Sequence, residues 1–180
     1  MHIEVDRLDE AGAPFAHTYA PDELALEDER AQLSSATHVE GHAAKQREQV
    51  RVTGKIEGAV EVQCDRCLRP VASPLQTEFD LAYAPASVLD EAEADEVKEL
   101  QDEDLIVAFY EGDRLDVDEL VREQVLLALP MRLLCREDCK GLCLSCGADL
   151  NNDPCACAQP EVDPRWSALA ALKQDGNGQA

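Results

Sequence analysis

Cysteine placement is the sequence feature that most constrains how this chain can fold. Six of the eight cysteines lie in CREDCKGLCLSCGADLNNDPCAC, residues 135–157, and the other two lie far upstream in QCDRCLRP. Cys64/Cys67 and Cys143/Cys146 are CxxC pairs, a spacing typical of turns that present two thiolates to one zinc ion. The glycine that follows Cys146 permits the backbone conformation that such a turn requires.

The number of cysteines predicts two zinc sites. A tetrahedral site takes four ligands, so six local cysteines are too many for one ion and too few for two, and the upstream pair resolves this. We expect one site to contain Cys64, Cys67, Cys135 and Cys139, and a second to contain Cys143, Cys146, Cys155 and Cys157. The first site would join the sheet-forming part of the chain to its C-terminal part. Other pairings stay open, because Cys155 and Cys157 are separated by a single residue.

Three other chemistries compete with zinc for these cysteines. Cys139, Cys143 and Cys146 have the spacing that radical-SAM enzymes use for an iron–sulfur cluster, but 180 residues cannot supply the large barrel of those enzymes. CDRC could be a thioredoxin-like redox pair, but such a pair opens a helix and Pro70 opposes one. Unligated core cysteines remain a further alternative.

The charge of the chain limits its partners. The formal net charge is −22, which by default repels nucleic acid and anionic membranes and favours basic partners. Nine carboxylates and one lysine lie between Leu89 and Asp104, a segment that reads as a solvated linker or as a surface for a basic protein. The N-terminus lacks the apolar region of a signal peptide, and the apolar stretch 125–131 is too short for a membrane span. We expect a cytoplasmic protein with reduced thiols and no membrane association.

Hydrophobic periodicity predicts an α+β fold: an antiparallel sheet with a packed helix, a cysteine-rich zinc-binding loop and a C-terminal helix. Strands are expected at 2–5, 37–46, 49–56, 59–64, 75–83 and 105–110, with breaks at Gly54, Gly58 and Pro70 and a turn at 111–113. Residues 21–33 could form a short helix or a charged loop.

Two helices have clear start signals. Asp116 is a plausible N-cap, and an apolar face follows it, formed by Val117, Leu120, Val121, Val125, Ala128 and Leu129. Pro130 ends this helix. Asp163 and Pro164 predict the start of a C-terminal helix that extends to Lys173, with Trp166, Leu169 and Leu172 on one side.

These signals divide the chain into five regions. They are a mainly β region (1–84), an acidic linker or loop (85–104), a strand and helix that complete the core (105–134), a cysteine-rich zinc-binding segment (135–160), and a C-terminal helix and tail (161–180).

Basic residues gather near the cysteines in an otherwise acidic chain: Arg66, Arg69, Arg132, Arg136 and Lys140. A zinc ion with four thiolates carries a formal charge of −2, so these cations could simply compensate it. Alternatively they form an RNA-binding surface, because phosphate contacts need Arg and Lys on one face. No catalytic constellation accompanies them, since the four histidines all lie in the first quarter of the chain without partners placed by spacing.

Four segments, in order, resemble the YceD family of bacterial large ribosomal RNA subunit accumulation proteins: CDRCLRPV (64–71), REQVLLALPMRLLC (122–135), CKGLCLSCGADLN (139–151) and DPRWSALAAL (163–172). The resemblance implies a non-catalytic ribosome biogenesis factor needed for accumulation of large-subunit ribosomal RNA, and it does not identify the direct partner. We expect the protein to act by binding that RNA, its precursors or an assembly intermediate. An alternative is a zinc-stabilised acidic adaptor for a basic ribosomal protein.

Overall fold

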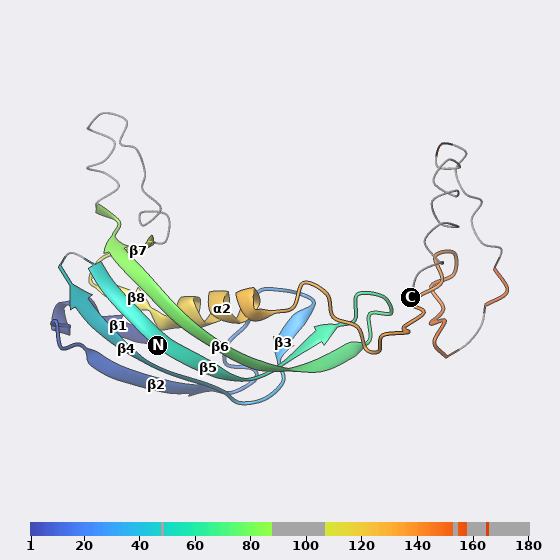
Figure 1. The fold of residues 1–180 in the computed structure, drawn as a ribbon, viewed down its shortest axis with the longest axis horizontal. Coiled ribbons are helices and arrows are strands. Elements are labelled where there is room, and N and C mark those ends of the chain that lie inside the picture. The colour runs from blue at the N-terminus through green and yellow to red at the C-terminus, as the bar shows by residue number, and fades with distance from the viewer. Residues whose placement is uncertain (48, 88–106, 153–154, 158–164, 166–180) are drawn as a thin grey trace, which may run out of the picture.

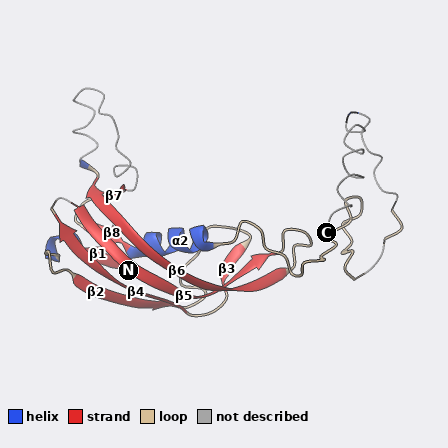
Figure 2. Ribbon diagram, in the orientation of Figure 1, coloured by secondary structure: helices blue, strands red, loops and turns tan. Residues whose placement is uncertain are grey.

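The computed structural model describes residues 1–47, 49–87, 107–152, 155–157 and 165. Within them the chain is mostly sheet with one α-helix (Figure 2). The elements are β1 His2–Glu4, the 3-10 turn η1 Val5–Arg7, β2 Ala13–Tyr19, β3 Ala31–Leu33, β4 Thr37–Gln46, β5 Gln49–Gln63, β6 Pro70–Pro85, β7 Val107–Tyr110, β8 Arg114–Asp116 and α2 Val117–Ala128.

The larger sheet has six strands in the order β2-β4-β5-β6-β7, with β3 also paired to β5. β5 is antiparallel to β4 on one edge and to β6 on the other. Val50, Val52, Ile56 and Val60 of β5 are buried and alternate with polar or exposed positions. The sheet therefore covers the core with one face and meets water with the other.

β5 is one continuous strand, so the predicted breaks at Gly54 and Gly58 are wrong. A Cβ at Gly54 would clash with the carbonyl of Glu40 and lie 2.6 Å from Cζ of Phe79, and one at Gly41 would lie 2.6 Å from Cζ of Phe15. Aromatic rings thus fill the space above Gly54 and Gly41. The glycines permit a tightly curved sheet rather than an interruption, and the long strands bend around α2 (Figure 1).

The last strand of the sheet runs in an unexpected direction. β7 is parallel to β6, with Ala82 opposite Val107 and Pro85 opposite Tyr110, so the expectation of a purely antiparallel sheet is wrong. A parallel pair requires a long connection, and residues 86–106 provide one. The predicted strand at 105–110 agrees over its described part, and the turn that follows contains Gly112 with a positive φ of 65°.

The N-terminal third differs from expectation in two places. Residues 21–30 form turns and loops, which agrees with the charged-loop alternative and not with the short helix considered for 21–33, and residues 31–33 are β3. β2, which pairs with β4 at the edge of the sheet, was not predicted. Its sequence APFAHTY has few β-branched residues, and its strand conformation is supported by pairing rather than by intrinsic preference.

Helix α2 lies on the concave side of the sheet (Figure 1). Asp116 caps it, because Oδ1 of this residue accepts hydrogen bonds from the N–H groups of Asp118 at 2.8 Å and Glu119 at 3.3 Å. The buried residues of α2, which are Val117, Leu120, Val121 and Val125, belong to the same core as the inward face of the sheet. Of the predicted apolar face, Leu129 packs against the core but Ala128 is exposed, and Leu126, which was not predicted there, also packs against the core.

Several contacts fix α2 to the rest of the fold. The hydroxyl of Tyr19 in β2 donates to Asp118 Oδ1 at 2.6 Å. Burial, and then this hydrogen bond, raise the pKa of Tyr19 above its ordinary value, so the hydroxyl stays protonated and donating. β1 and β8 pair as a second, two-stranded sheet, with Ile3 opposite Leu115.

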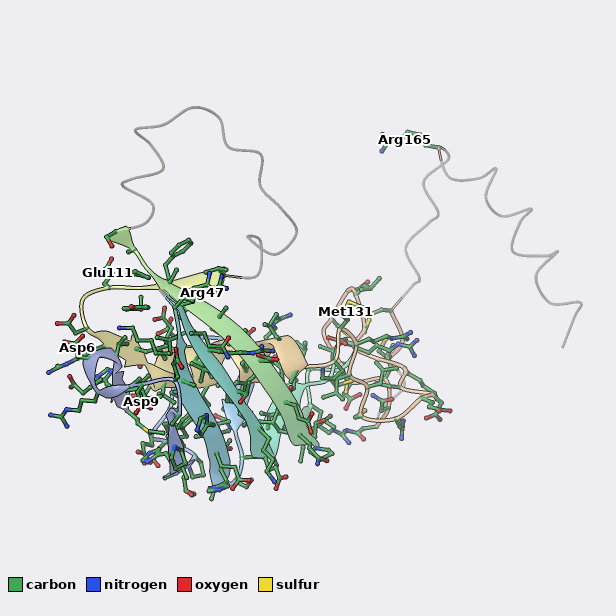
Figure 3. All side chains as sticks on the ribbon, turned by 60° about the vertical axis from the view of Figure 1, so that its left-hand side comes forward. Asp6, Asp9, Arg47, Glu111, Met131 and Arg165 are labelled. Carbon is green, nitrogen blue, oxygen red and sulfur yellow. The ribbon has the colours of Figure 1, made fainter. Side chains whose placement is uncertain are left out.

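The cysteine-rich segment follows α2 and extends past the end of the sheet (Figure 1). The side chain of Met131 is fully exposed and lies where the chain passes from α2 into this segment (Figure 3). The predicted C-terminal helix and the acidic stretch 89–104 lie outside the described residues. The five-region division of the chain stays a prediction.

Candidate metal centres

The first centre joins two segments that are far apart in sequence. The Sγ atoms of Cys64, Cys67, Cys135 and Cys139 all lie within 4.8 Å of one another. Sγ of Cys64 is 3.9 Å from Sγ of Cys139, and Sγ of Cys67 is 3.6 Å from Sγ of Cys135. These are the four residues that the sequence assigns to one site, and the centre attaches the β5–β6 turn to the segment after α2.

Hydrogen bonds hold these two segments together beside the thiols. The Asp65 N–H donates to the carbonyl of Leu133 at 2.9 Å, and the Leu133 N–H donates to Asp65 Oδ2 at 2.7 Å. The Leu142 N–H donates to the carbonyl of Arg66 at 3.1 Å. Cys64, Cys67 and Cys139 are buried, with Val71, Leu134 and Leu142 around them. The first centre thus has a small core of its own, separate from the core beneath the sheet.

The second centre is local and more exposed. The Sγ atoms of Cys143, Cys146, Cys155 and Cys157 also lie within 4.8 Å of one another, but Cys146 and Cys157 are exposed. Its sulfurs come from one hairpin and a short following segment. Leu142 and Asp149 form the bridge that closes this hairpin. This grouping also matches the four residues predicted from sequence.

The two CxxC turns have the same backbone pattern. In the first, the Leu68 N–H donates to the carbonyl of Cys64 at 2.9 Å and the Cys64 N–H donates to Arg69 at 2.8 Å. In the second, Gly147 donates to Cys143 at 2.8 Å and Cys143 donates to Ala148 at 2.8 Å. The residue after the second cysteine has a positive φ in both turns, 57° at Leu68 and 74° at Gly147. CDRCLR therefore forms the same turn as CLSCGA, with leucine in the position that favours glycine.

Hydrogen bonds to sulfur favour ionised thiols at defined positions. Burial would raise the pKa of Cys64, but the N–H groups of Cys67, Arg66 and Cys135 lower it to about 6. The N–H groups of Cys146 and Ser145, and then the neighbouring thiols, lower the pKa of Cys143 to about 6. Each centre therefore contains a thiol that ionises readily, and ionised thiols are the form that binds a metal.

Both clusters fit a tetrahedral metal ion with sulfur ligands. Zinc–sulfur bonds of about 2.3 Å place the sulfurs of a tetrahedron about 3.8 Å apart. The Sγ separations of 3.9 Å and 3.6 Å in the first centre agree with that spacing. All eight cysteines are free rather than disulfide-bonded. Two clusters of four could therefore each hold a metal ion, and the identity of the ion stays a prediction.

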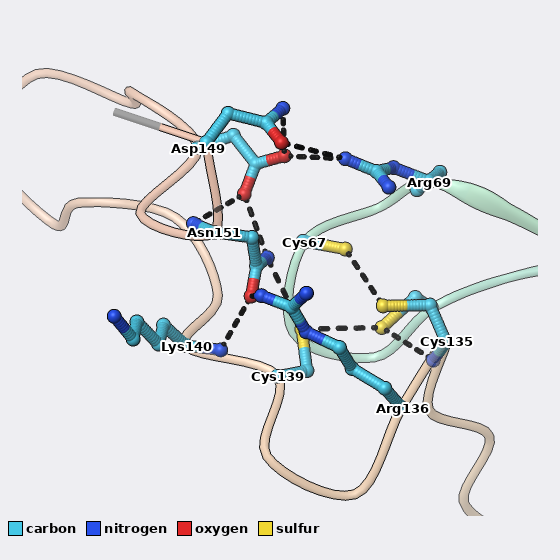
Figure 4. A network of polar contacts seen from close by, with 10 residues as sticks. Cys67, Arg69, Cys135, Arg136, Cys139, Lys140, Asp149 and Asn151 are labelled. Atoms are coloured by element: carbon cyan, nitrogen blue, oxygen red, sulfur yellow. Dashed lines mark hydrogen bonds and ion pairs between the residues drawn. The ribbon is translucent and has the colours of Figure 1, made fainter. Parts of the chain in front are cut away.

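The five predicted RNA-binding residues fall into two groups. Arg66 Nη1 donates to the carbonyl of Cys139 at 2.6 Å, Arg69 pairs with Asp149 at 2.9 Å, and Arg136 donates to Asn151 Oδ1 at 2.8 Å. These three side chains bind the protein itself around the first centre, and Figure 4 shows Arg69 and Arg136 in this network. Arg132 and Lys140 are exposed, and neither side chain has a partner among the described residues.

Asp149 and Asn151 are site residues that the sequence analysis missed. Asn151 Nδ2 donates to Cys139 Sγ at 3.4 Å, and Asn151 Oδ1 accepts from the Lys140 N–H at 2.8 Å (Figure 4). Asp149 Oδ1 accepts from the Asn151 N–H at 2.9 Å, an Asx-type turn. The signal in the sequence was the run ADLNN directly after the second CxxC turn, because Asp and Asn commonly bind nearby backbone groups.

A family model described as "Large ribosomal RNA subunit accumulation protein YceD" matches residues 52–173, a range that contains both centres. The chain belongs to the YceD family. This confirms the resemblance inferred from the four sequence segments. The family description supports a ribosome-related role.

Relatives of this YceD family member occur in bacteria and plants. Uncharacterized proteins of Mycobacterium tuberculosis and Mycobacterium bovis are each 32% identical to it over 182 residues, covering 96% of this chain and 81% of theirs. A chloroplastic large ribosomal RNA subunit accumulation protein YCED homolog 1 of Arabidopsis thaliana is 24% identical, covering 72% of this chain and 46% of the plant protein. No solved structure matches the chain. None of the helices in the described part could cross a membrane.

Proposed function

We propose that this chain is a non-catalytic ribosome biogenesis factor that promotes accumulation of large-subunit ribosomal RNA by binding that RNA or an assembly intermediate. Membership of the YceD family carries the proposal, because the match spans both cysteine clusters. The polar side chains around the first centre bind backbone and sulfur atoms. Such contacts suit a structural centre that holds the surrounding loops in a fixed conformation for binding.

Both centres are proposed to hold Zn²⁺, about two ions per chain. Four cysteine sulfurs in a closed set suit structural zinc, which leaves no open position for a substrate. Metal analysis of the purified, reduced protein should give about two zinc ions. Cys64→Ser should remove about one, and adding Cys135→Ser should remove no more, because both residues serve one ion. An iron–sulfur absorption spectrum, or absence of metal, would contradict this assignment.

Direct RNA contact is proposed for the cations that remain accessible. Arg132 and Lys140 are exposed and have no side-chain partner in the described residues, whereas Arg66, Arg69 and Arg136 bind the protein. Arg residues engaged internally can still face phosphate with their free N–H groups. Each phosphate contact adds roughly one unit to the salt dependence of binding, so a patch of this size supports weak, salt-sensitive association.

A second candidate function is an acidic adaptor for a basic ribosomal protein. Two observations favour it: the formal net charge is −22, and three of the five candidate RNA-binding side chains already have partners within the protein. A strongly acidic protein attracts basic partners and repels phosphate. In this case association with ribosomal precursors would depend on protein rather than on RNA.

One experiment separates the two candidates. Tagged protein is purified with its partners from cells, with and without RNase, and compared with Arg132→Glu/Lys140→Glu and with the control Arg7→Glu/Arg47→Glu. The control makes the same charge change at exposed residues, and Arg47 lies far from Met131 and the cysteine segment (Figure 3). Direct RNA contact predicts loss of large-subunit precursors only in the first variant and after RNase. A basic ribosomal protein that stays bound in both would establish the adaptor instead.

A further inference from the structure

The hairpin of the second centre contacts the ligands of the first. Asn151, near the end of this hairpin, donates from Nδ2 to Cys139 Sγ at 3.4 Å. Its Oδ1 accepts from the Lys140 N–H at 2.8 Å and from Arg136 Nη2 at 2.8 Å. One amide side chain therefore binds a ligand sulfur and both sides of the loop that carries it.

The position of Asn151 is itself set by the hairpin. Asp149 Oδ1 accepts from the Asn151 N–H at 2.9 Å and from its Nδ2 at 2.7 Å. Asp149 Oδ2 accepts from Arg69 at 2.9 Å, and the Leu150 N–H donates to the carbonyl of Gly141 at 3.0 Å. These contacts start just after the CxxC turn of Cys143 and Cys146. A metal ion bound by that turn would therefore fix the position of Asn151.

We propose that Asn151 couples the two centres, so that zinc in the second centre strengthens zinc binding by the first. This rests on the proposal that both centres bind zinc. Metal in the second centre fixes the hairpin, and the fixed hairpin holds Asn151 against Cys139 and the 136–140 loop. The coupling is reciprocal, because a binding free energy shared by two sites acts equally on both.

Electrostatics alone would give the opposite sign. Two zinc ions with four thiolates each are both anionic and repel one another. Arg69 and Arg136 bind residues of the hairpin, and so place positive charge at the contact between the centres. Each guanidinium also pairs with a carboxylate, Asp149 or Asp138, so these cations offset the repulsion only in part, and the hydrogen bonds of Asn151 then determine the sign of the coupling.

The coupling is measured by chelator competition on the full-length protein. Residues that hydrogen-bond to metal ligands typically contribute roughly 10–100-fold to metal affinity. Asn151→Ala should therefore lower the zinc affinity of the first centre roughly 10–100-fold in chelator competition. Asn152→Ala is the matched control, because Asn152 contacts Asp149 and Arg69 but no sulfur in the described residues. Cobalt loaded into the first centre should change its thiolate absorption band in Asn151→Ala and not in the control.

A double-mutant cycle tests the coupling itself. Cys143→Ser/Cys146→Ser, which removes the second centre, should weaken zinc binding by the first about 5–150-fold, the usual range for linked sites. In the Asn151→Ala background the same change should weaken it no further. Equal first-centre affinity with and without the second centre would overturn the coupling while leaving two zinc ions per chain. A wild-type protein that binds no zinc would instead overturn the metal-binding proposal.

Discussion

Leu68 is a residue whose side chain and backbone conformation conflict. Its φ of 57° lies in the left-handed region, and its side chain is exposed. This conformation costs residues other than glycine roughly 1–2 kcal/mol, because they carry a Cβ atom. The equivalent position of the second turn is Gly147, at which the same backbone bonds form without that cost. The first turn therefore contains strain that the second lacks.

Replacing Leu68 by glycine should stabilise the turn. Leu68→Gly is expected to be more stable than Leu68→Ala by about 1 kcal/mol, because both lose the side chain but only glycine relieves the left-handed conformation. Urea unfolding of the two variants measures the difference. Equal stability of the two variants would mean that the turn changes its backbone when the leucine is removed.

At the scale of elements, the curvature of the sheet depends on Gly54 in β5. Gly54→Ala should lower the free energy of unfolding by about 1–3 kcal/mol, because the new methyl group would overlap the Glu40 carbonyl and the ring of Phe79. Ala72→Val is a suitable control, since it adds bulk at an exposed position of β6 and should change stability by about 0.5 kcal/mol or less. Urea unfolding followed by circular dichroism reports both values.

The cap of α2 gives a second test at this scale. Asp116→Ala should lower the free energy of unfolding by about 1 kcal/mol, because the N–H groups of Asp118 and Glu119 lose their acceptor. Asp116→Asn retains an acceptor oxygen and should recover most of that loss. If Asp116→Asn and Asp116→Ala are equally destabilised, the carboxylate contributes through charge rather than through capping.

Local patterns predicted the elements that local forces determine. Asp116 and the apolar spacing after it located α2, and alternation located β4 and most of β5 and β6. Gly54 and Gly58 misled because their role is set by neighbouring strands, which sequence spacing does not show. β7 is parallel to β6 because of the end of the sheet at which the chain re-enters it, and local sequence patterns do not determine that end. The grouping of the eight sulfurs followed from ligand number, but Asn151 was missed because its partners lie in a separate loop.

At the scale of the whole molecule, two separate cores predict a divided response to metal removal. The sheet and α2 share one buried cluster, and the thiols of the first centre form another. A strong chelator should therefore abolish protection of backbone amides in residues 133–152 while amides in β4 and β5 stay protected. Hydrogen exchange with and without chelator measures this. Loss of protection across the whole sheet would show that the first centre stabilises both cores.

The first centre also imposes an order on the folding steps that occur as the chain is synthesised. Cys64 and Cys67 are synthesised before β6 and α2, whereas Cys135 and Cys139 come after them. The β4–β5–β6 meander pairs neighbours along the chain and can form first, because local pairings close quickly. At that stage two thiols form only half a site. On the proposal that this centre binds zinc, capture of the ion is delayed until α2 has emerged, and the ion is taken up by a chain whose sheet is already in place.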